Sequence, residues 1–151
     1  MRPKVTVVCG PPASGKTTYV RKWAQAGDLI VDVDTLYEAL SGLPMYDRPK
    51  ELLSFVCEAR DAVIQRLKRH SDVGRAWIIT SAPRMATRNS FRLAFAATVI
   101  VLEVALNECT RRIDQDERRR GQLGEWHLLV KEWWQNYEPN AADIVTKEDS
   151  S

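Results

Sequence analysis

Long apolar runs are missing from the sequence, and their absence excludes several classes of protein. No stretch approaches the roughly 20 consecutive apolar residues that a membrane-spanning helix requires. The first residues, Met1 to Lys4, lead into a short strand-like run in place of the apolar core of a signal peptide. We therefore expect a cytoplasmic protein.

Cysteines are few, and neither sign of charge is in large excess. The three cysteines, Cys9, Cys57 and Cys109, lie far apart in apolar surroundings without a C-x-x-C pair. This pattern favours reduced core residues over a disulfide framework, a metal site or a catalytic thiol. The net charge is only +2, which does not indicate a nucleic-acid binder by itself. Acids are concentrated from Glu138 onward, so the preceding chain has room for a local basic site.

Length and composition predict one globular domain. The 151 residues, 44% of them hydrophobic and 28% charged, suffice for one buried core but not for two domains. We expect residues 1–139 to form this domain. The polar segment 140–151 is expected to be a frayed tail, although Ile144 and Val145 could add a short edge strand.

Short apolar, β-branched runs alternate with helical segments along the chain. The runs that are typical of buried strands are residues 5–9, 29–33, 76–80 and 98–102. The expected helices cover residues 17–25, 35–40, a long stretch capped by Asp47 and Pro49, 87–94 and 126–137. This alternation predicts an α/β fold with a parallel sheet of four or five strands and helices on both faces.

Residues 10–17 match the phosphate-loop pattern G-x-x-x-x-G-K-[ST] at every fixed position, and they lie between a predicted strand and a predicted helix. Backbone N–H groups and a helix N-terminus hold phosphate oxygens in such a loop. Lys16 would contact the β- and γ-phosphates, and Thr17 would bind Mg²⁺. The sequence therefore predicts a site for ATP or GTP with Mg²⁺. Its expected residues are Gly10, Pro11, Pro12, Ala13, Ser14, Gly15, Lys16, Thr17 and Thr18.

Two acids, Asp32 and Asp34, lie at the end of the second predicted strand. In open α/β sheets, ligands bind at the carboxyl ends of the strands, close to the phosphate loop. Asp34, at the strand-to-helix junction, is the candidate base or positioner for an attacking hydroxyl. Asp32 could touch substrate or be structural. A helix N-cap is the alternative role for Asp34.

The third predicted strand ends in Thr80, Ser81 and Ala82 and lacks a strand-end acid of the Walker B type, which disfavours a motor-type ATPase. Thr80 or Ser81 could hydrogen-bond near the phosphates. Arg84 and Arg88 follow the strand end, where an anionic acceptor could lie. Their alternative is ordinary solvated surface.

The densest charge in the chain lies between Arg111 and Gly121. Guanidinium groups on a closing segment stabilise the charge that develops during phosphoryl transfer, so this segment is a candidate lid. The alternative is an exposed helix with i,i+4 ion pairs such as Asp114 with Arg118.

Several aromatic residues follow the candidate lid. The spacing of Trp126 and Trp133, with Leu129 and Val130 between them, favours packing of this helix over a platform that stacks bases.

The motifs together resemble the P-loop kinases related to the kinase domain of phage polynucleotide 5′-kinase. The likeness covers residues 10–17, residues 27–34 with the following helix, and the arginine-rich segment after the fourth strand. It spans about residues 4–121.

The resemblance implies roles for particular residues. Lys16 and Thr17 would hold phosphate and Mg²⁺, and Asp34 would be the general base for the acceptor hydroxyl. An arginine within residues 111–120, with Arg112 and Arg118 as the first candidates, would clamp the donor phosphates.

The sequence departs from the family pattern in two places. The residues after the candidate base, Thr35 to Glu38, lack the arginine that helps to hold the acceptor phosphate in that family, and residues 80–82 replace its acid after the third strand. The sequence nevertheless predicts an ATP-dependent kinase acting on a hydroxyl, favouring a nucleic-acid 5′-end or a nucleotide-like acceptor. The alternatives are a nucleoside or small-metabolite kinase and an ATPase module that assists a larger assembly.

Overall fold

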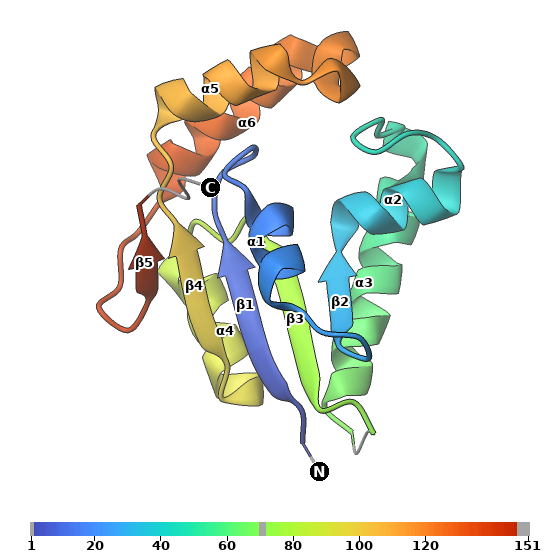
Figure 1. Cartoon of the computed structure of the whole chain (residues 1–151), viewed down its shortest axis with the longest axis vertical. Coiled ribbons are helices and arrows are strands. Elements are labelled where there is room, and N and C mark those ends of the chain that lie inside the picture. Colours follow the sequence, from blue (N-terminus) through green and yellow to red (C-terminus); the bar gives the residue numbers. More distant parts are fainter. Residues whose placement is uncertain (1, 70–71, 148–151) are drawn as a thin grey trace.

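Five parallel strands form the centre of the protein in a computed structural model that describes residues 2–69 and 72–147 (Figure 1). The strands are β1 (Lys4–Cys9), β2 (Leu29–Asp32), β3 (Arg75–Thr80), β4 (Thr98–Leu102) and β5 (Ile144–Thr146). Their spatial order is β2-β3-β1-β4-β5, and every neighbouring pair is parallel. The α/β class and the parallel sheet that the sequence predicts are therefore confirmed.

Side chains along β1 point alternately to the two faces of the sheet, and each face packs against its own apolar layer. Val5, Val7 and Cys9 belong to one buried layer, whereas Val8 belongs to the layer on the other face. Both faces are covered, which explains why the strands are nearly continuous apolar runs in the sequence.

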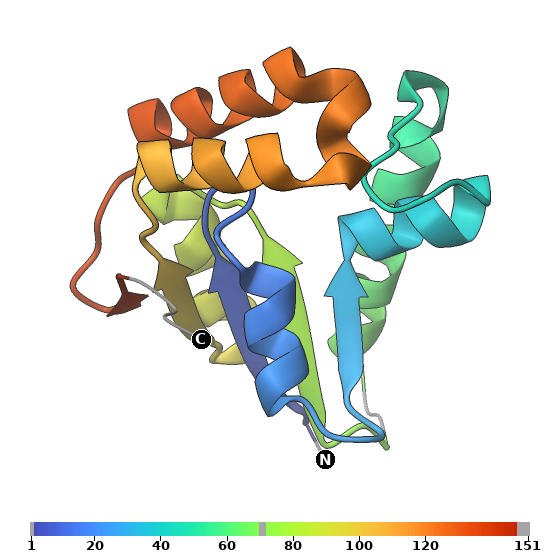
Figure 2. The same cartoon turned by 45° about the horizontal axis from the view of Figure 1, so that its top comes forward.

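Helices cover both faces of the sheet and its upper edge (Figures 1 and 2). The α-helices are α1 (Lys16–Trp23), α2 (Val33–Ser41), α3 (Leu53–Leu67), α4 (Met85–Phe95), α5 (Leu106–Gln115) and α6 (Leu123–Asn136). Helix α1 packs on one face, and α3 and α4 pack on the other. Helices α5 and α6 pack against each other above the carboxyl ends of the strands, around an apolar layer that includes Ile113 and Trp126. No helix among residues 2–69 and 72–147 has the length and apolarity to cross a bilayer.

The arginine-rich segment is broken at Asp116. This residue is extended and its carboxylate accepts a hydrogen bond from the Arg118 backbone N–H, which starts the 3₁₀ helix η2 (Glu117–Gln122). Arg118 pairs with Asp116, and Asp114 contacts His127 of α6 instead. The i,i+4 pair of Asp114 with Arg118 is therefore a wrong prediction, because the helix does not continue between them.

The start of α3 also differs from the prediction. Pro49 precedes a short 3₁₀ helix, η1 (Lys50–Leu52), and α3 follows it without a side-chain cap. Asp47 is thus not the N-cap of the long helix. The segment from Gly42 to Pro49 forms a loop between α2 and α3, which we call the α2–α3 loop.

The C-terminal segment adopts the edge strand, which was one of its two predicted alternatives. Strand β5 pairs with β4, and the buried Asp143 just before it accepts from Arg88 and Arg92 of α4. Residues 148–151 of the predicted tail lie outside the described residues.

Candidate active site

The phosphate loop connects β1 to α1 at the carboxyl edge of the sheet. Gly10 packs closely: a Cβ there would lie 2.6 Å from the Ser14 Oγ and 3.0 Å from the Leu102 carbonyl oxygen. Gly15 has φ 91°, a left-handed conformation that glycine adopts readily. No side chain caps α1, so the first-turn N–H groups remain available to phosphate oxygens. The Ser14 hydroxyl is buried without a partner among the described residues.

Lys16 is folded back onto its own loop. Its Nζ donates to the Gly10 and Pro11 carbonyl oxygens, both at 2.8 Å. Burial lowers the pKa of Lys16 to about 8, while the charge of Asp34 acts in the opposite direction. An anion entering the loop would favour the charged ammonium.

Thr17 and Asp32 lie side by side at the end of β2. The Thr17 hydroxyl donates to Asp32 Oδ2 at 3.2 Å. Burial, and then the charge of Asp34, raise the pKa of Asp32. A hydroxyl and a carboxylate in contact provide the oxygen ligands that Mg²⁺ prefers, so these residues fit the predicted metal.

Asp32, and not Asp34, caps α2. Asp32 Oδ1 accepts from the Asp34 backbone N–H at 3.0 Å, and Asp32 Oδ2 also accepts from the Thr35 hydroxyl at 3.3 Å. Asp34 therefore does not cap the helix, which was the alternative role that the sequence offered for it.

Asp34 is paired with an arginine from the α2–α3 loop. Arg48 Nε lies 2.7 Å and Nη2 2.5 Å from Asp34 Oδ1. No described residue donates to Asp34 Oδ2. Arg48 thus fixes one carboxylate oxygen and leaves the other open.

Arg112, in the segment that the sequence predicts to be a lid, reaches the phosphate loop. Its Nη1 donates to the Ala13 carbonyl oxygen at 3.1 Å, and its Nε is held by Glu108 at 3.0 Å. Hydrogen bonds, chiefly from Arg111 and also from Arg112, lower the pKa of Glu108 to about 2, although partial loss of solvent acts in the opposite direction. The Glu108 carboxylate therefore stays charged and orients Arg112 over the loop.

Two further arginines of the segment 111–120, Arg118 and Arg119, contact the α2–α3 loop. The guanidinium carbons of Arg119 and Arg118 lie 3.8 Å and 4.8 Å from the centre of the Tyr46 ring. Those of Arg48 and Arg119 lie 4.7 Å and 4.8 Å from the Trp126 ring. We call Tyr46, Arg48, Arg119 and Trp126 the bridge cluster, because it connects this loop to η2 and α6.

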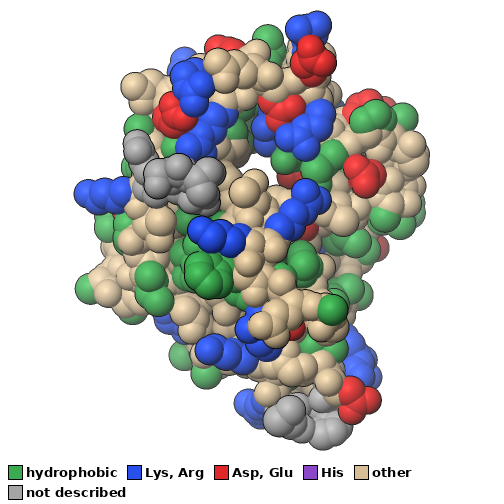
Figure 3. Space-filling view, viewed as in Figure 1, with side chains coloured by type: hydrophobic (Ala, Val, Ile, Leu, Met, Phe, Trp, Pro, Cys, Tyr) green, Lys and Arg blue, Asp and Glu red, His purple; other side chains and the backbone are tan. Residues whose placement is uncertain are grey.

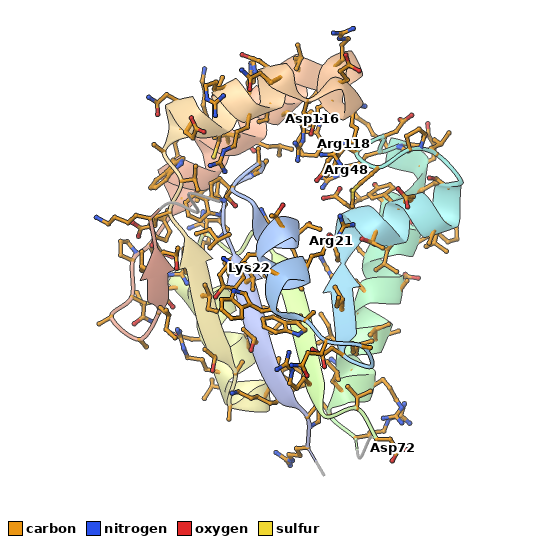
Figure 4. The ribbon with its side chains drawn as sticks, in the orientation of Figure 1. Arg21, Lys22, Arg48, Asp72, Asp116 and Arg118 are labelled. Carbon is orange, nitrogen blue, oxygen red and sulfur yellow. The ribbon has the colours of Figure 1, made fainter. Side chains whose placement is uncertain are left out.

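These groups surround one cleft of about 720 Å³, between the lid and the ends of α2 and α3. Figure 3 shows the hollow with basic side chains at its margin, and Figure 4 shows Arg48, Asp116 and Arg118 facing it. The cleft is lined by Pro12 to Thr18, Asp32, Asp34, Arg112 and Arg118 among the predicted residues. Thr80 and Ser81 also line it.

Arg84 and Arg88 do not line this cleft. Arg88 has no exposed side-chain surface and donates to Asp143 and to the carbonyl oxygens of Ala82, Pro83 and Glu138. The prediction that Arg88 contacts substrate is therefore wrong, because its guanidinium is a structural group of the core. Arg84 is exposed and donates to Asn136.

The tryptophans pack as the sequence predicts. Trp133 is buried against Tyr137, and its indole N–H donates to the Ser81 carbonyl oxygen at 2.7 Å. Trp126 is also buried, although its ring lines the cleft.

The cysteines also pack largely as predicted. Burial raises the pKa of Cys9 to about 12 and that of Cys109 to about 11, so both are thiols at neutral pH. Cys57 is half-buried at the cleft and is also free.

Arg48 and Tyr46 are the residues that sequence reasoning missed, whereas Arg119 lies within the predicted arginine-rich segment but was not one of its first candidates. Arg48 lies 14 residues after Asp34 and therefore beyond residues 35–38, where the resemblance predicts an acceptor arginine. The sequence does contain a signal for these residues: an aromatic residue and an arginine lie between Pro44 and Pro49, and such residues on a loop often bind ligands.

Comparisons with known proteins agree with this architecture. A family model described as AAA domain matches residues 5–135. A gluconokinase from Sinorhizobium meliloti 1021 is similar in structure, with a TM-score of 0.60 at 16% identity, covering 99% of this chain and 85% of that chain. A shikimate kinase from Acinetobacter baumannii in complex with shikimate has a TM-score of 0.59 at 18% identity, with 99% and 85% covered.

A chain of the Pnkp1/Rnl/Hen1 RNA repair complex has a TM-score of 0.59 at 14% identity, covering 90% of this chain and 46% of that chain. These likenesses confirm the P-loop kinase type of fold. The specific likeness to phage polynucleotide kinase stays a prediction. No curated protein gives a significant match to the sequence.

Proposed function

The chain belongs to the AAA domain family through residues 5–135, and we propose that it is an ATP-dependent kinase that transfers the γ-phosphoryl group to a hydroxyl. The observation that carries the proposal is the joint position of the phosphate loop and Asp34 in one cleft. Asp34 has one oxygen held by Arg48 and one oxygen without a donor among the described residues. This is the state that a base for an incoming hydroxyl requires.

The donor phosphates would bind the backbone N–H groups of the loop and the first turn of α1, with the Lys16 ammonium moving from its carbonyl partners to the β- and γ-phosphates. Arg112, oriented by Glu108, would contact the donor from the lid. Thr17 and Asp32 would hold Mg²⁺, directly or through water. When bound, the metal would neutralise charge on the phosphates.

The acceptor hydroxyl would donate to Asp34 Oδ2. Its oxygen attacks the γ-phosphorus, its proton passes to the carboxylate, and the bond between the γ-phosphorus and the bridging oxygen breaks to release ADP. Exclusion of water by α5, η2 and α6 would favour this transfer over hydrolysis.

The acceptor is proposed to be a small molecule or a single terminal nucleotide. A cleft of about 720 Å³ that also has to receive the donor phosphates leaves limited space beside Asp34. A nucleic-acid 5′-end, a nucleoside and a small metabolite all meet this limit.

Transfer of label from γ-labelled ATP with Mg²⁺ tests the proposal. The acceptors are 5′-hydroxyl oligonucleotides, nucleosides, gluconate and shikimate. We expect label in at least one acceptor and a rate at least about 100-fold lower for Asp34→Asn, because this change removes the base. The control is Asp72→Asn, which alters an exposed acid at the far end of the molecule (Figure 4).

Label that reaches only water with every acceptor, together with normal hydrolysis by Asp34→Asn, would contradict the kinase. That outcome would support the ATPase module, which is the alternative in the sequence.

A further inference from the structure

Two aromatic side chains lie side by side on the outer surface of α1. The ring centres of Tyr19 and Trp23 are 6.5 Å apart, and their planes are tilted by 51°. Trp23 is 53% exposed, and Tyr19 is half-buried beside it. A single exposed apolar side chain is ordinary on a protein surface. Two adjacent rings, however, form an apolar area on which a planar group can stack.

Two cations lie between these rings in the sequence and beside them on the helix. Lys22 Nζ lies 5.6 Å from the centre of the Trp23 ring. Figure 4 shows Arg21 on the side of α1 that faces α2, and Lys22 on the side away from α2. Neither cation has a carboxylate partner among the described residues. We call Tyr19, Arg21, Lys22 and Trp23 the α1 surface. Figure 3 shows hydrophobic and basic side chains next to each other in front of α1.

Acidic side chains are missing from this part of the chain. Residues 16–27, which form α1 and the turn after it, contain no Asp or Glu. The next acid, Asp28, accepts hydrogen bonds from the Gln25 backbone N–H, the Trp77 indole N–H and the Arg75 guanidinium. These hydrogen bonds, chiefly that of the Gln25 backbone, lower the pKa of Asp28 to about 2. Because this acid is already engaged, the two cations of the α1 surface keep a positive charge that attracts an anionic partner.

The α1 surface begins where the cleft ends. Thr18 lines the cleft, whereas Arg21, Lys22 and Trp23 do not. Arg21 and Lys22 follow Thr18 at the i+3 and i+4 positions, so they lie on the same side of the helix, one turn further along. Trp23 is about 7.5 Å beyond Thr18 along the helix axis, at about 1.5 Å per residue. A chain-like ligand can therefore extend from the mouth of the cleft across α1.

We propose that the α1 surface binds single-stranded nucleic acid, with bases stacked on Tyr19 and Trp23 and phosphates held by Arg21 and Lys22. Aromatic rings stack on any base, and adjacent cations attract the backbone. Rings and cations within one helical turn therefore match the succession of bases and phosphates along a strand. A duplex keeps its bases stacked on each other, and an acidic peptide or a lipid headgroup has none. The proposal does not depend on the kinase function, because none of these four residues lines the cleft.

Fluorescence anisotropy with a 3′-labelled oligothymidylate of about 12 nucleotides measures the binding without any transfer of phosphate. We expect saturable binding at low salt, which Trp23→Ala weakens at least about fivefold because one stacked base loses its ring. Trp23→Phe should retain most of the affinity, since an aromatic ring remains. The matched control is Phe55→Ala, which removes a ring that is 65% exposed on α3, and it should bind as the unchanged protein does.

The salt dependence of the affinity tests the contacts with phosphate. Each phosphate contact on a single strand contributes about 0.7 to the slope of log K against log salt concentration. The double variant Arg21→Gln with Lys22→Gln should therefore reduce this slope by up to about 1.4. The control pair, Lys68→Gln with Arg69→Gln, removes two exposed cations at the end of α3 and should leave the slope unchanged. An unchanged slope in the α1 double variant would overturn the proposal.

Other ligands distinguish the kinds of partner. A duplex of the same length and vesicles that contain phosphatidylserine are titrated under the same conditions. Equal affinity of Trp23→Ala and the unchanged protein for the single strand would overturn the proposal. So would equal binding of the duplex, or binding to the vesicles without binding to the oligonucleotide. Asp34→Asn should bind the oligonucleotide as the unchanged protein does, so this result stands whether or not the kinase assay finds an acceptor.

Discussion

Lys16 shows how one residue depends on both the motif and the fold. The motif brings the lysine to the phosphate loop, whereas burial in the folded protein lowers its pKa to about 8. Without nucleotide, the ammonium is satisfied by two carbonyl oxygens of its own loop. Binding therefore exchanges these hydrogen bonds for contacts with phosphate.

Nucleotide affinity should depend on pH through Lys16. Bound phosphates raise the pKa of Lys16 above its value in the free protein, so affinity is fully present below pH 8 and is lost as the pH rises beyond it. The expected loss is up to about tenfold per pH unit. Calorimetric titration with a non-hydrolysable ATP analogue from pH 7 to pH 10 measures it.

Lys16→Ala is the control for this titration. It should bind the nucleotide more weakly at pH 7, with little dependence on pH above 8. Unchanged binding by this variant would contradict the role of Lys16 in the loop.

At the scale of elements, α4 and β5 are joined by buried charge. Asp143 precedes β5, and its carboxylate has no exposed surface; it lies between Arg88 and Arg92 of α4. The same Arg88 bonds three backbone carbonyls. This ion pair holds the C-terminal segment at the edge of the sheet. The polar composition of residues 140–151 had predicted a frayed tail, with a short edge strand as the alternative.

Arg88→Met should lower the free energy of unfolding by about 3–5 kcal/mol, because it leaves Asp143 buried without its main partner. Urea unfolding followed by circular dichroism measures the change. Arg84→Met, at the exposed start of the same helix, should stay within about 0.5 kcal/mol of the unchanged protein. A loss below about 1 kcal/mol for Arg88→Met would mean that the pair contributes little.

At the scale of the whole molecule, the bridge cluster joins two parts that flank the cleft. Tyr46 has φ 74°, a left-handed conformation that is uncommon for a bulky residue. Packing against Arg119 and the Trp126 ring stabilises it. The α2–α3 loop and the lid are therefore expected to respond together when the cleft is filled.

Hydrogen exchange tests this connection. Saturation with a non-hydrolysable ATP analogue should slow exchange in η2 and also in the α2–α3 loop. Tyr46→Ala should retain the effect in η2 and lose most of it in the loop, when both proteins are compared at equal saturation. Equal protection of the loop in the variant would contradict coupling through Tyr46.

The sequence by itself determined the features that depend on neighbouring residues. The phosphate loop needs eight consecutive positions, the strands need short apolar runs, and Asp34 follows its strand directly, so local patterns sufficed to predict them. The ends of helices were harder to predict from the sequence. Within the charged segment, α5 ends at Gln115, and the Asp116 side chain caps η2.

Only the tertiary structure decided which charges share the cleft. Arg48 reaches Asp34 from the α2–α3 loop, and Arg119 of η2 reaches Tyr46 of the same loop. Arg88 points into the core instead of toward the cleft. Arginine is compatible with an ion pair in the cleft, a contact with an aromatic ring and a buried ion pair in the core. The residue type alone therefore does not predict which of these an arginine will make. Packing of distant segments selects among them, since a guanidinium takes the partners that the folded chain places within its reach.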